Sequence, residues 1–242
     1  MICADELRGG GQTPELIVEW RHGFVVGATL QALNRDRPVN LGDLVKRLLP
    51  LPVCRFLRRV SFGLNHGATS YGAQQNDYAP VVAALIDSPQ RGRLQRLEFG
   101  VQEPDVDEEF GEAEPLLPWG DLSALWPHVP GLRELLVKGS GGVLGELDLP
   151  ELRAVAFEIQ GDDQETFNEI IAASWPKLER FELWDRDSGV ELEPLLHVLA
   201  ALPLTHLALP YTEQLAPPPP NADLDIPDGR PPSASPSRSQ VT

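Results

Sequence analysis

Residues 135 to 158, LLVKGSGGVLGELDLPELRAVAFE, have a glycine spacing that could bind a nucleotide. Gly139, Gly141 and Gly145 follow an apolar run, and Glu158 comes about 20 residues after the first glycine. In a dinucleotide-binding fold, such glycines let the backbone approach the pyrophosphate, and such an acid binds the ribose. The spacing makes a nucleotide-binding enzyme one hypothesis for this chain.

The same fold also needs a crossover helix of about a dozen residues after the glycines. The segment between Gly145 and Glu151 is too short for such a helix, and Pro150 would break it. We therefore expect a compact extended segment here, with the glycines at positive φ in a tight turn against a neighbouring segment. A nucleotide-binding enzyme that uses the glycine cluster at residues 139–145 stays as the alternative.

The histidines and cysteines do not form a recognisable catalytic or metal-binding pattern. No two histidines have the i, i+4 spacing of a metal site on a helix, and there is no HExxH motif. Cys3 and Cys54 are too few for a disulfide framework, and Cys54 is expected to be a small buried apolar residue. We expect no catalytic residue, no metal and no cofactor, and hence no enzyme activity.

The net charge of −16 is unevenly distributed along the 242 residues. The acidic groups are concentrated after residue 100, which argues against nucleic acid and anionic lipid as partners, because both bind through Lys and Arg. The densest acidic run is residues 101–115, VQEPDVDEEFGEAEP. We expect a solvated loop there, with calcium or a basic partner as alternatives.

No apolar run approaches the roughly 18 residues of a membrane-spanning helix. The N-terminal MICADELRGGGQ also lacks the basic start and apolar stretch of a signal peptide. These features predict a cytoplasmic protein that does not bind membranes.

One short pattern, LxxLxL with conservative exchanges, recurs along the chain. Its alternating apolar positions predict a strand with one buried face. The six copies begin at Leu57, Leu94, Leu132, Leu152, Leu178 and Leu204.

The intervals between these copies predict a leucine-rich-repeat solenoid. The last three intervals fall within the roughly 20 to 29 residues of such repeats, and the first two are longer. The longer intervals predict insertions at residues 64–77 and 101–118. The predicted fold is α/β, with a parallel curved sheet on the concave face and with helices and loops on the convex face.

Helix signals appear between the predicted strands. Asn40 and Asp77 could cap helices, TFNE at residues 166–169 could be a capping box, and leucines from Leu192 to Leu199 form an apolar stripe. Before the first repeat, LIVEWRHGFVVGATL predicts a β-hairpin that turns at Gly23. This hairpin and the helix after it should cap the solenoid.

These elements predict a single solenoid with flanking segments. Residues 1–14 are expected to be flexible, 15–50 to form the cap, 51–215 to form the repeats, and 216–242 to form a disordered Pro-rich tail. The tail could be an SH3-type ligand, or the end of a truncated or frame-shifted gene. The last repeat lacks an obvious cap, which predicts self-association through its edge strand.

Several segments together resemble a known family. WRHGF, LPVCRFLRRVSFG, LPELRAVAF and AASWPKLERFELW are similar to bacterial, myxobacterial-type leucine-rich-repeat proteins, which resemble ribonuclease-inhibitor-like horseshoes. The resemblance covers roughly residues 16–210. It implies a binding scaffold without an established enzyme activity.

For such a scaffold, we expect the partner to bind at the third, fifth and seventh positions of each motif, which should be exposed on the concave face. Trp184, among Arg and Glu, has the composition of an interface hot spot, although it could instead pack on the edge of its own repeat. Trp175 is expected in the core. The predicted partner-binding residues are Arg59, Arg96, Glu98, Glu134, Lys138, Glu158, Arg180, Glu182, Trp184 and His206.

The leading hypothesis is a non-enzymatic scaffold that binds another protein. The alternatives are the nucleotide-binding enzyme and a degenerate repeat fragment that has no partner of its own.

Overall fold

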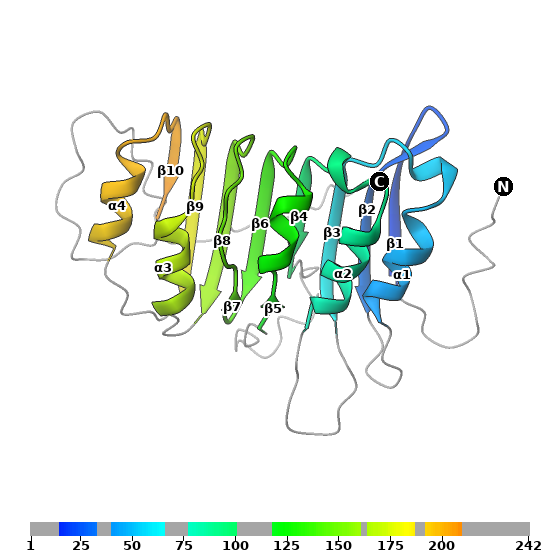
Figure 1. Ribbon diagram of the computed structural model, residues 1–242, viewed down its shortest axis with the longest axis horizontal. Coiled ribbons are helices and arrows are strands. Elements are labelled where there is room, and N and C mark those ends of the chain that lie inside the picture. Colours follow the sequence, from blue (N-terminus) through cyan, green and yellow to red (C-terminus); the bar gives the residue numbers. More distant parts are fainter. Residues whose placement is uncertain are drawn as a thin grey trace, which may run out of the picture.

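The computed structural model describes residues 15–32, 40–65, 77–100, 118–160, 164–186 and 192–209. These residues form a mixed α/β structure around one large sheet, with helices packed on one side of it (Figure 1). The predicted N-terminal segment, most of both predicted insertions and the Pro-rich tail lie outside the described residues.

The large sheet has eight strands in the order β1-β2-β3-β4-β6-β8-β9-β10. Only β1 and β2 pair antiparallel, and all later neighbours pair parallel. The strands are β1 (Glu15–Arg21), β2 (Phe24–Ala32), β3 (Arg59–Asn65), β4 (Arg96–Phe99), β6 (Glu134–Gly139), β8 (Ala154–Gln160), β9 (Arg180–Arg186) and β10 (His206–Ala208).

The described helices all lie in front of the same sheet face in Figure 1. They are α1 (Leu41–Leu48), α2 (Ala79–Asp87), α3 (Gln164–Ala172) and α4 (Glu193–Leu199), with 3₁₀ turns η2 (Pro52–Cys54), η3 (Arg91–Arg93) and η5 (Ser123–His128). The longest of them, α2 and α3, have nine residues each, so no described helix could cross a bilayer.

All six LxxLxL motifs form strands of this sheet. The apolar positions stack across the strands, because parallel pairing places equivalent residues side by side, as in Val60–Leu97–Leu135. The first leucine of each motif packs just before its strand and is fully buried in five of the six copies. Leu204, in the last copy, is only partly buried. The motif therefore forms the core on the helix side.

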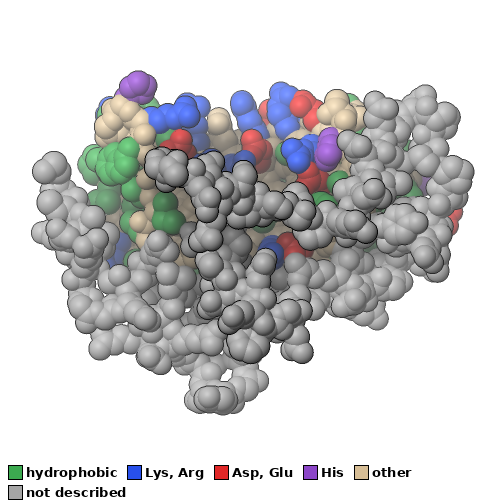
Figure 2. Space-filling view, turned by 180° about the vertical axis from the view of Figure 1, so that it is seen from behind, with side chains coloured by type: hydrophobic (Ala, Val, Ile, Leu, Met, Phe, Trp, Pro, Cys, Tyr) green, Lys and Arg blue, Asp and Glu red, His purple; other side chains and the backbone are tan. Residues whose placement is uncertain are grey.

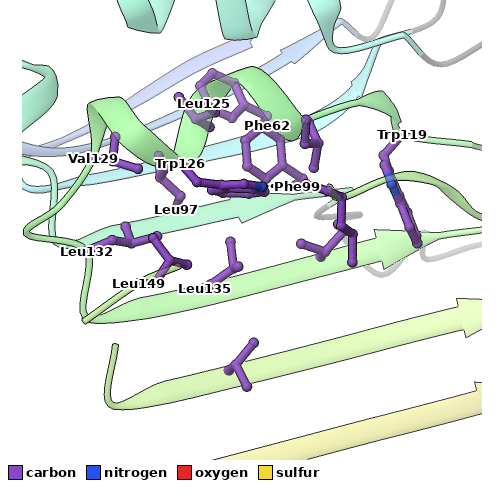
Figure 3. Packing of buried hydrophobic residues seen from close by; sticks show 14 of the residues in the cluster. Phe62, Leu97, Phe99, Trp119, Leu125, Trp126, Val129, Leu132, Leu135 and Leu149 are labelled. Atoms are coloured by element: carbon purple, nitrogen blue, oxygen red, sulfur yellow. Dashed lines mark hydrogen bonds between the residues drawn. The ribbon is translucent and has the colours of Figure 1, made fainter. Parts of the chain in front are cut away.

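Aromatic residues complete the core between the sheet and the connecting segments. Phe62 and Phe99 stack with ring centroids 5.3 Å apart, and Trp126 lies beside them in Figure 3. The Trp126 indole donates a 2.5 Å hydrogen bond to the carbonyl of Leu144. Trp175 is also buried, and it stacks on Phe157, which confirms its expected core position.

The N-terminal hairpin has the predicted form. β1 and β2 are joined by His22 and Gly23, both with positive φ. The second strand, β2, then pairs parallel with β3, so the hairpin extends the sheet. Cys54 is buried, as expected. β3 continues through Asn65, two residues into the segment that the sequence predicts as an insertion.

The helix starts differ in how well the sequence predicts them. Asn40 caps α1, since its side chain accepts a 2.8 Å hydrogen bond from the amide of Gly42. Asp77 accepts from the amide of Ala79, but Tyr78 occupies the N-cap position of α2. The capping box predicted in TFNE is wrong, because α3 already begins at Gln164 and both polar side chains bind elsewhere.

The glycine segment returns from β6 to β8 without a helix, as predicted. It contains β7 (Gly142–Val143), which pairs with β5 (Gly120–Asp121) in a second, two-stranded sheet. Gly141, Gly142 and Gly145 have positive φ, whereas Gly139 ends strand β6. The polar residues of TFNE bind this segment: Thr166 donates to the carbonyl of Gly142, and Glu169 accepts from the amide of Leu144.

Candidate functional site

The candidate site is the open face, which we define as the outward side chains on the sheet face opposite the helices. Parallel pairing arranges these side chains in rows across the strands. The first row is Arg59, Arg96, Glu134, Ala154, Arg180 and His206. The second row is Ser61, Glu98, Leu136, Ala156, Glu182 and Ala208. A third row has Lys138, Glu158 and Trp184.

Over β3, β4 and β6, the charged side chains of the open face bind one another. Arg96 forms ion pairs with Glu98 on its own strand and with Glu134 on β6, the latter at 2.7 Å. Glu98 also accepts a hydrogen bond from Ser61. Arg59 forms an ion pair with Glu19 of the hairpin. These contacts hold each arginine in one orientation.

Burial and charge act in opposite directions on Arg96. Its partial burial lowers the pKa of the guanidinium, but the hydrogen bonds and charges of Glu98 and Glu134 more than offset this effect. The net result is a raised pKa, so Arg96 stays positively charged. The open face therefore keeps a fixed cation at its centre.

The third row places an aromatic side chain next to an ion pair. Lys138 on β6 and Glu158 on β8 form an ion pair at 2.9 Å, and both side chains are largely buried. Trp184 on β9 lies directly opposite Glu158, and it is 43% exposed. Trp184 thus presents part of its indole to solvent.

At the C-terminal end of the described sheet, Glu182 is shared by two basic groups. Arg180, two residues earlier on β9, forms an ion pair with it, and His206 on β10 approaches it to 3.4 Å. The predicted site residues thus lie on one face, where most of the charged ones form ion pairs.

The prediction that all these positions are exposed is wrong for Glu98, which is only 8% exposed. Arg96 and Ser61 cover it from both sides. Ser61 and Ala208, at the same position of their motifs, are buried as well. The sequence pattern places these side chains on the outward face, but neighbouring strands determine whether solvent reaches them.

A shallow depression of about 240 Å³ lies over β8 on the open face. Its floor contains Ala154, Ala156 and Leu136, and its walls are formed by charged side chains on both sides. The depression exists because β8 has alanine at two successive outward positions, whereas β9 has Arg180 and Glu182 there and β6 has Glu134 and Leu136. The wall residues are Arg96, Glu134, Arg180 and Glu182.

Sequence reasoning counted the two alanines as outward positions but did not assign them to the site. The available signal is the pair of small residues in LRAVAF, because each of the other motifs has arginine, glutamate or histidine at the first of these two positions. Such a pair lowers the surface of one strand relative to its neighbours.

The glycine segment is packed against a neighbouring coil and not against open space. A Cβ atom on Gly142 would lie 2.4 Å from the carbonyl oxygen of Gly120 and 2.5 Å from the indole of Trp119. A Cβ atom on Gly145 would lie 2.4 Å from the Cβ of Ser123. The glycines therefore permit a close approach between two segments of the chain. Among the described residues, no cluster of His, Cys, Asp and Glu could hold a metal ion.

Comparison with known proteins shows a similarity of fold. No protein-family profile matches the chain, and no curated protein matches its sequence. A crystal structure of a Bacteroides fragilis protein from a structural genomics consortium is 19% identical, with a TM-score of 0.57. The match covers 74% of this chain and 51% of that protein, so the chain spans about half of the protein's length. The two proteins share a fold over the matched residues.

Proposed function

We propose that this protein is a non-enzymatic leucine-rich-repeat scaffold that binds another protein on its open face. The observation that carries the proposal is the depression over β8, with its apolar floor and a wall of paired charges. Interfaces commonly combine a small apolar centre with a polar rim. We expect a partner to insert one apolar side chain into this depression.

The solenoid architecture is supported by the repeating strand, its spacing and its register. Six LxxLxL strands follow one another in chain order in the sheet, and each equivalent residue pairs with its counterpart on the next strand. In a solenoid, each repeat contacts only its neighbours, which produces such an ordered sheet. The short return through the glycine segment would be its tightest repeat.

The charged wall should contribute specificity more than affinity. Arg96 and Arg180 are already held by carboxylates, so a partner finds them ordered and loses little side-chain entropy on binding. Exposed Trp184 lies one row away from the depression, where it can extend an interface as an aromatic anchor.

The test is affinity capture of a partner from the source cells, identified by mass spectrometry, followed by variants of the open face. Ala156→Arg should fill the depression, and Trp184→Ala with Arg180→Glu should remove the anchor and reverse one wall charge. Both variants should lose the partner while they keep the circular dichroism spectrum of the wild type.

Trp20→Ala is the matched control, because Trp20 is an exposed tryptophan at 56% that pairs with Val25 in the hairpin, away from β8. This variant should capture the partner as well as the wild type does. A folded Ala156→Arg variant with undiminished capture would show that the partner binds on another surface.

A further inference from the structure

A second surface lies at the edge where the parallel strands begin. The guanidinium of Arg55 lies over two phenylalanine rings, with its central carbon 4.3 Å from the centre of Phe24 and 4.8 Å from the centre of Phe56. The two rings pack edge to face with their centroids 4.8 Å apart, and the Phe56 side chain is 43% exposed. Two aromatic rings thus hold a cation in place at the surface.

Two further arginines lie near the backbone of Arg55, one through a hydrogen bond and one along the chain. Arg93 donates a 2.7 Å hydrogen bond from its guanidinium to the carbonyl of Arg55, which joins η3 to the loop after η2. Arg58 follows three residues after Arg55 and is exposed. We call Phe24, Arg55, Phe56, Arg58 and Arg93 the rim patch. Figure 2 shows basic side chains along the upper rim of the face opposite the helices, the rim at which the parallel strands begin.

The rim patch differs from the open face in its charge balance. On the open face, Arg59, Arg96 and Arg180 each form an ion pair with a glutamate. Among the described residues, no carboxylate forms an ion pair with Arg55, Arg58 or Arg93. The patch therefore carries three positive charges that the described fold does not neutralise.

The size and charge of this patch favour a short acidic ligand over a long polyanion. At physiological salt, electrostatic interactions are screened beyond about 8 Å, so a short segment at the rim interacts mainly with these arginines. A nucleic acid would extend along a chain whose net charge is −16, and its dense phosphates would be repelled. The two phenylalanines add an apolar contact that carboxylates alone do not use.

We propose that the rim patch docks a short acidic segment of another protein, in which glutamate or aspartate flanks an aromatic or aliphatic side chain. The carboxylates would accept hydrogen bonds from Arg58 and Arg93, and the apolar side chain would lie against Phe56. Arg55 is already ordered by the two rings, so its charge is available without a loss of side-chain entropy. The patch is separate from the depression over β8, so it can be tested independently of the proposed function.

The test uses the full chain and three labelled probes in fluorescence anisotropy. The probes are a fluorescein-labelled peptide in which glutamates surround one phenylalanine, the same peptide with serine in place of phenylalanine, and a single-stranded DNA oligomer of equal length. The phenylalanine peptide should bind most tightly, and its affinity should fall with added salt. Phe56→Ser should lower the affinity for the phenylalanine peptide and leave the affinity for the serine peptide unchanged.

The informative variant is Arg58→Glu with Arg93→Glu. This variant should bind the phenylalanine peptide with an affinity lower by roughly tenfold or more, because two charge-assisted hydrogen bonds are lost. The matched control is Lys46→Glu with Arg47→Glu on α1, which makes the same change in net charge at two exposed positions that are not part of the rim patch. The control should bind the peptide within about twofold of the wild type.

Four outcomes would overturn the proposal. If both double variants lose the same affinity for the phenylalanine peptide, binding depends only on net charge. If neither variant loses affinity, the peptide binds on another surface. Tighter binding of DNA than of both peptides would identify a nucleic-acid surface. A concentration-dependent dimer in sedimentation that Arg58→Glu with Arg93→Glu abolishes would identify a second copy of this chain as the occupant.

Discussion

The hydroxyl of Ser61 on β3 donates a hydrogen bond to the carboxylate of Glu98 on β4, and both side chains are buried. The same carboxylate forms an ion pair with Arg96. Glu98 therefore joins two strands of the open face at a position that the repeat pattern alone assigns to solvent. A buried carboxylate of this kind depends on its partners for stability.

Glu98→Ala should lower the free energy of unfolding by about 1–3 kcal/mol, because Ser61 loses its acceptor and Arg96 loses one of its two carboxylates. Glu98→Gln should lower the free energy of unfolding by less, since its amide oxygen can still accept a hydrogen bond from Ser61. Urea denaturation measures both. Glu179→Ala removes an exposed ion pair with Arg153 and should change stability by no more than about 1 kcal/mol. Equal losses in all three variants would contradict the special role of Glu98.

Gly142→Ala should destabilise the protein by about 2–4 kcal/mol, since the added Cβ meets the carbonyl of Gly120 and the backbone has a φ of +154°. Thermal unfolding by circular dichroism measures the change. Gly92→Ala is the control, because a Cβ atom there has nothing within 4 Å, and its effect should stay within about 1 kcal/mol. A Gly142→Ala variant as stable as the wild type would mean that the two segments do not pack closely.

NAD and ATP should leave the melting temperature unchanged, because the close packing of Gly142 and Gly145 against Gly120 and Ser123 leaves no room for a phosphate at these positions. A thermal-shift titration with each nucleotide tests this expectation. A dose-dependent rise in the melting temperature would instead favour the nucleotide-binding enzyme.

The Cys54 thiol should resist alkylation in the folded protein. Cys54 is fully buried, and desolvation raises the pKa of its thiol. Because the folded pKa lies above the unfolded one, the stability that comes from burying the neutral thiol is present at neutral pH and is lost as the pH rises through the folded pKa. A Cys3→Ser variant isolates Cys54 for labelling with a thiol reagent at pH 8. Labelling of the native protein as fast as in guanidinium chloride would contradict the burial.

Lys177→Met should reduce the pH dependence of stability in the acid range. A hydrogen bond from Lys177, and secondarily its charge, lower the pKa of the Glu151 carboxyl. The pair therefore stabilises the fold above the ordinary carboxyl pKa, and this contribution is lost as the pH falls from about 5 to 3. NMR titration of Glu151 measures its pKa in both proteins. The same Glu151 pKa in both would show that the contact does not form in solution.

Much of the sheet could be predicted from the spacing of LxxLxL. Leu97 and Val60 are 37 residues apart in sequence but pair directly, and the pattern anticipates this, because each motif repeats the same alternation. Asn40 was recognisable as a helix cap for a similar reason: its hydrogen bond reaches only two residues along the chain.

The roles of Thr166 and Glu169 could not be predicted in the same way. Their side chains match a local capping box, but they bind the backbone of Gly142 and Leu144, about one repeat earlier. The depression over β8 also depends on residues that are distant in sequence. The short side chains of Ala154 and Ala156 form its floor because the longer side chains of Glu134 and Arg180 lie on the neighbouring strands.

Local sequence patterns are enough to predict the number and order of the motif strands, the hairpin before them and the absence of a helix in the glycine segment. Each of these follows from local periodicity, turn chemistry or the length of a connection. Three-dimensional packing sets the burial of Glu98, the pairing of charges on the open face, and the lack of a carboxylate partner for Arg58 and Arg93 among the described residues. Apart from the two ion pairs within one strand, Arg96–Glu98 and Arg180–Glu182, these properties depend on side chains from different strands or turns, whose distances and exposure are set when the strands pair.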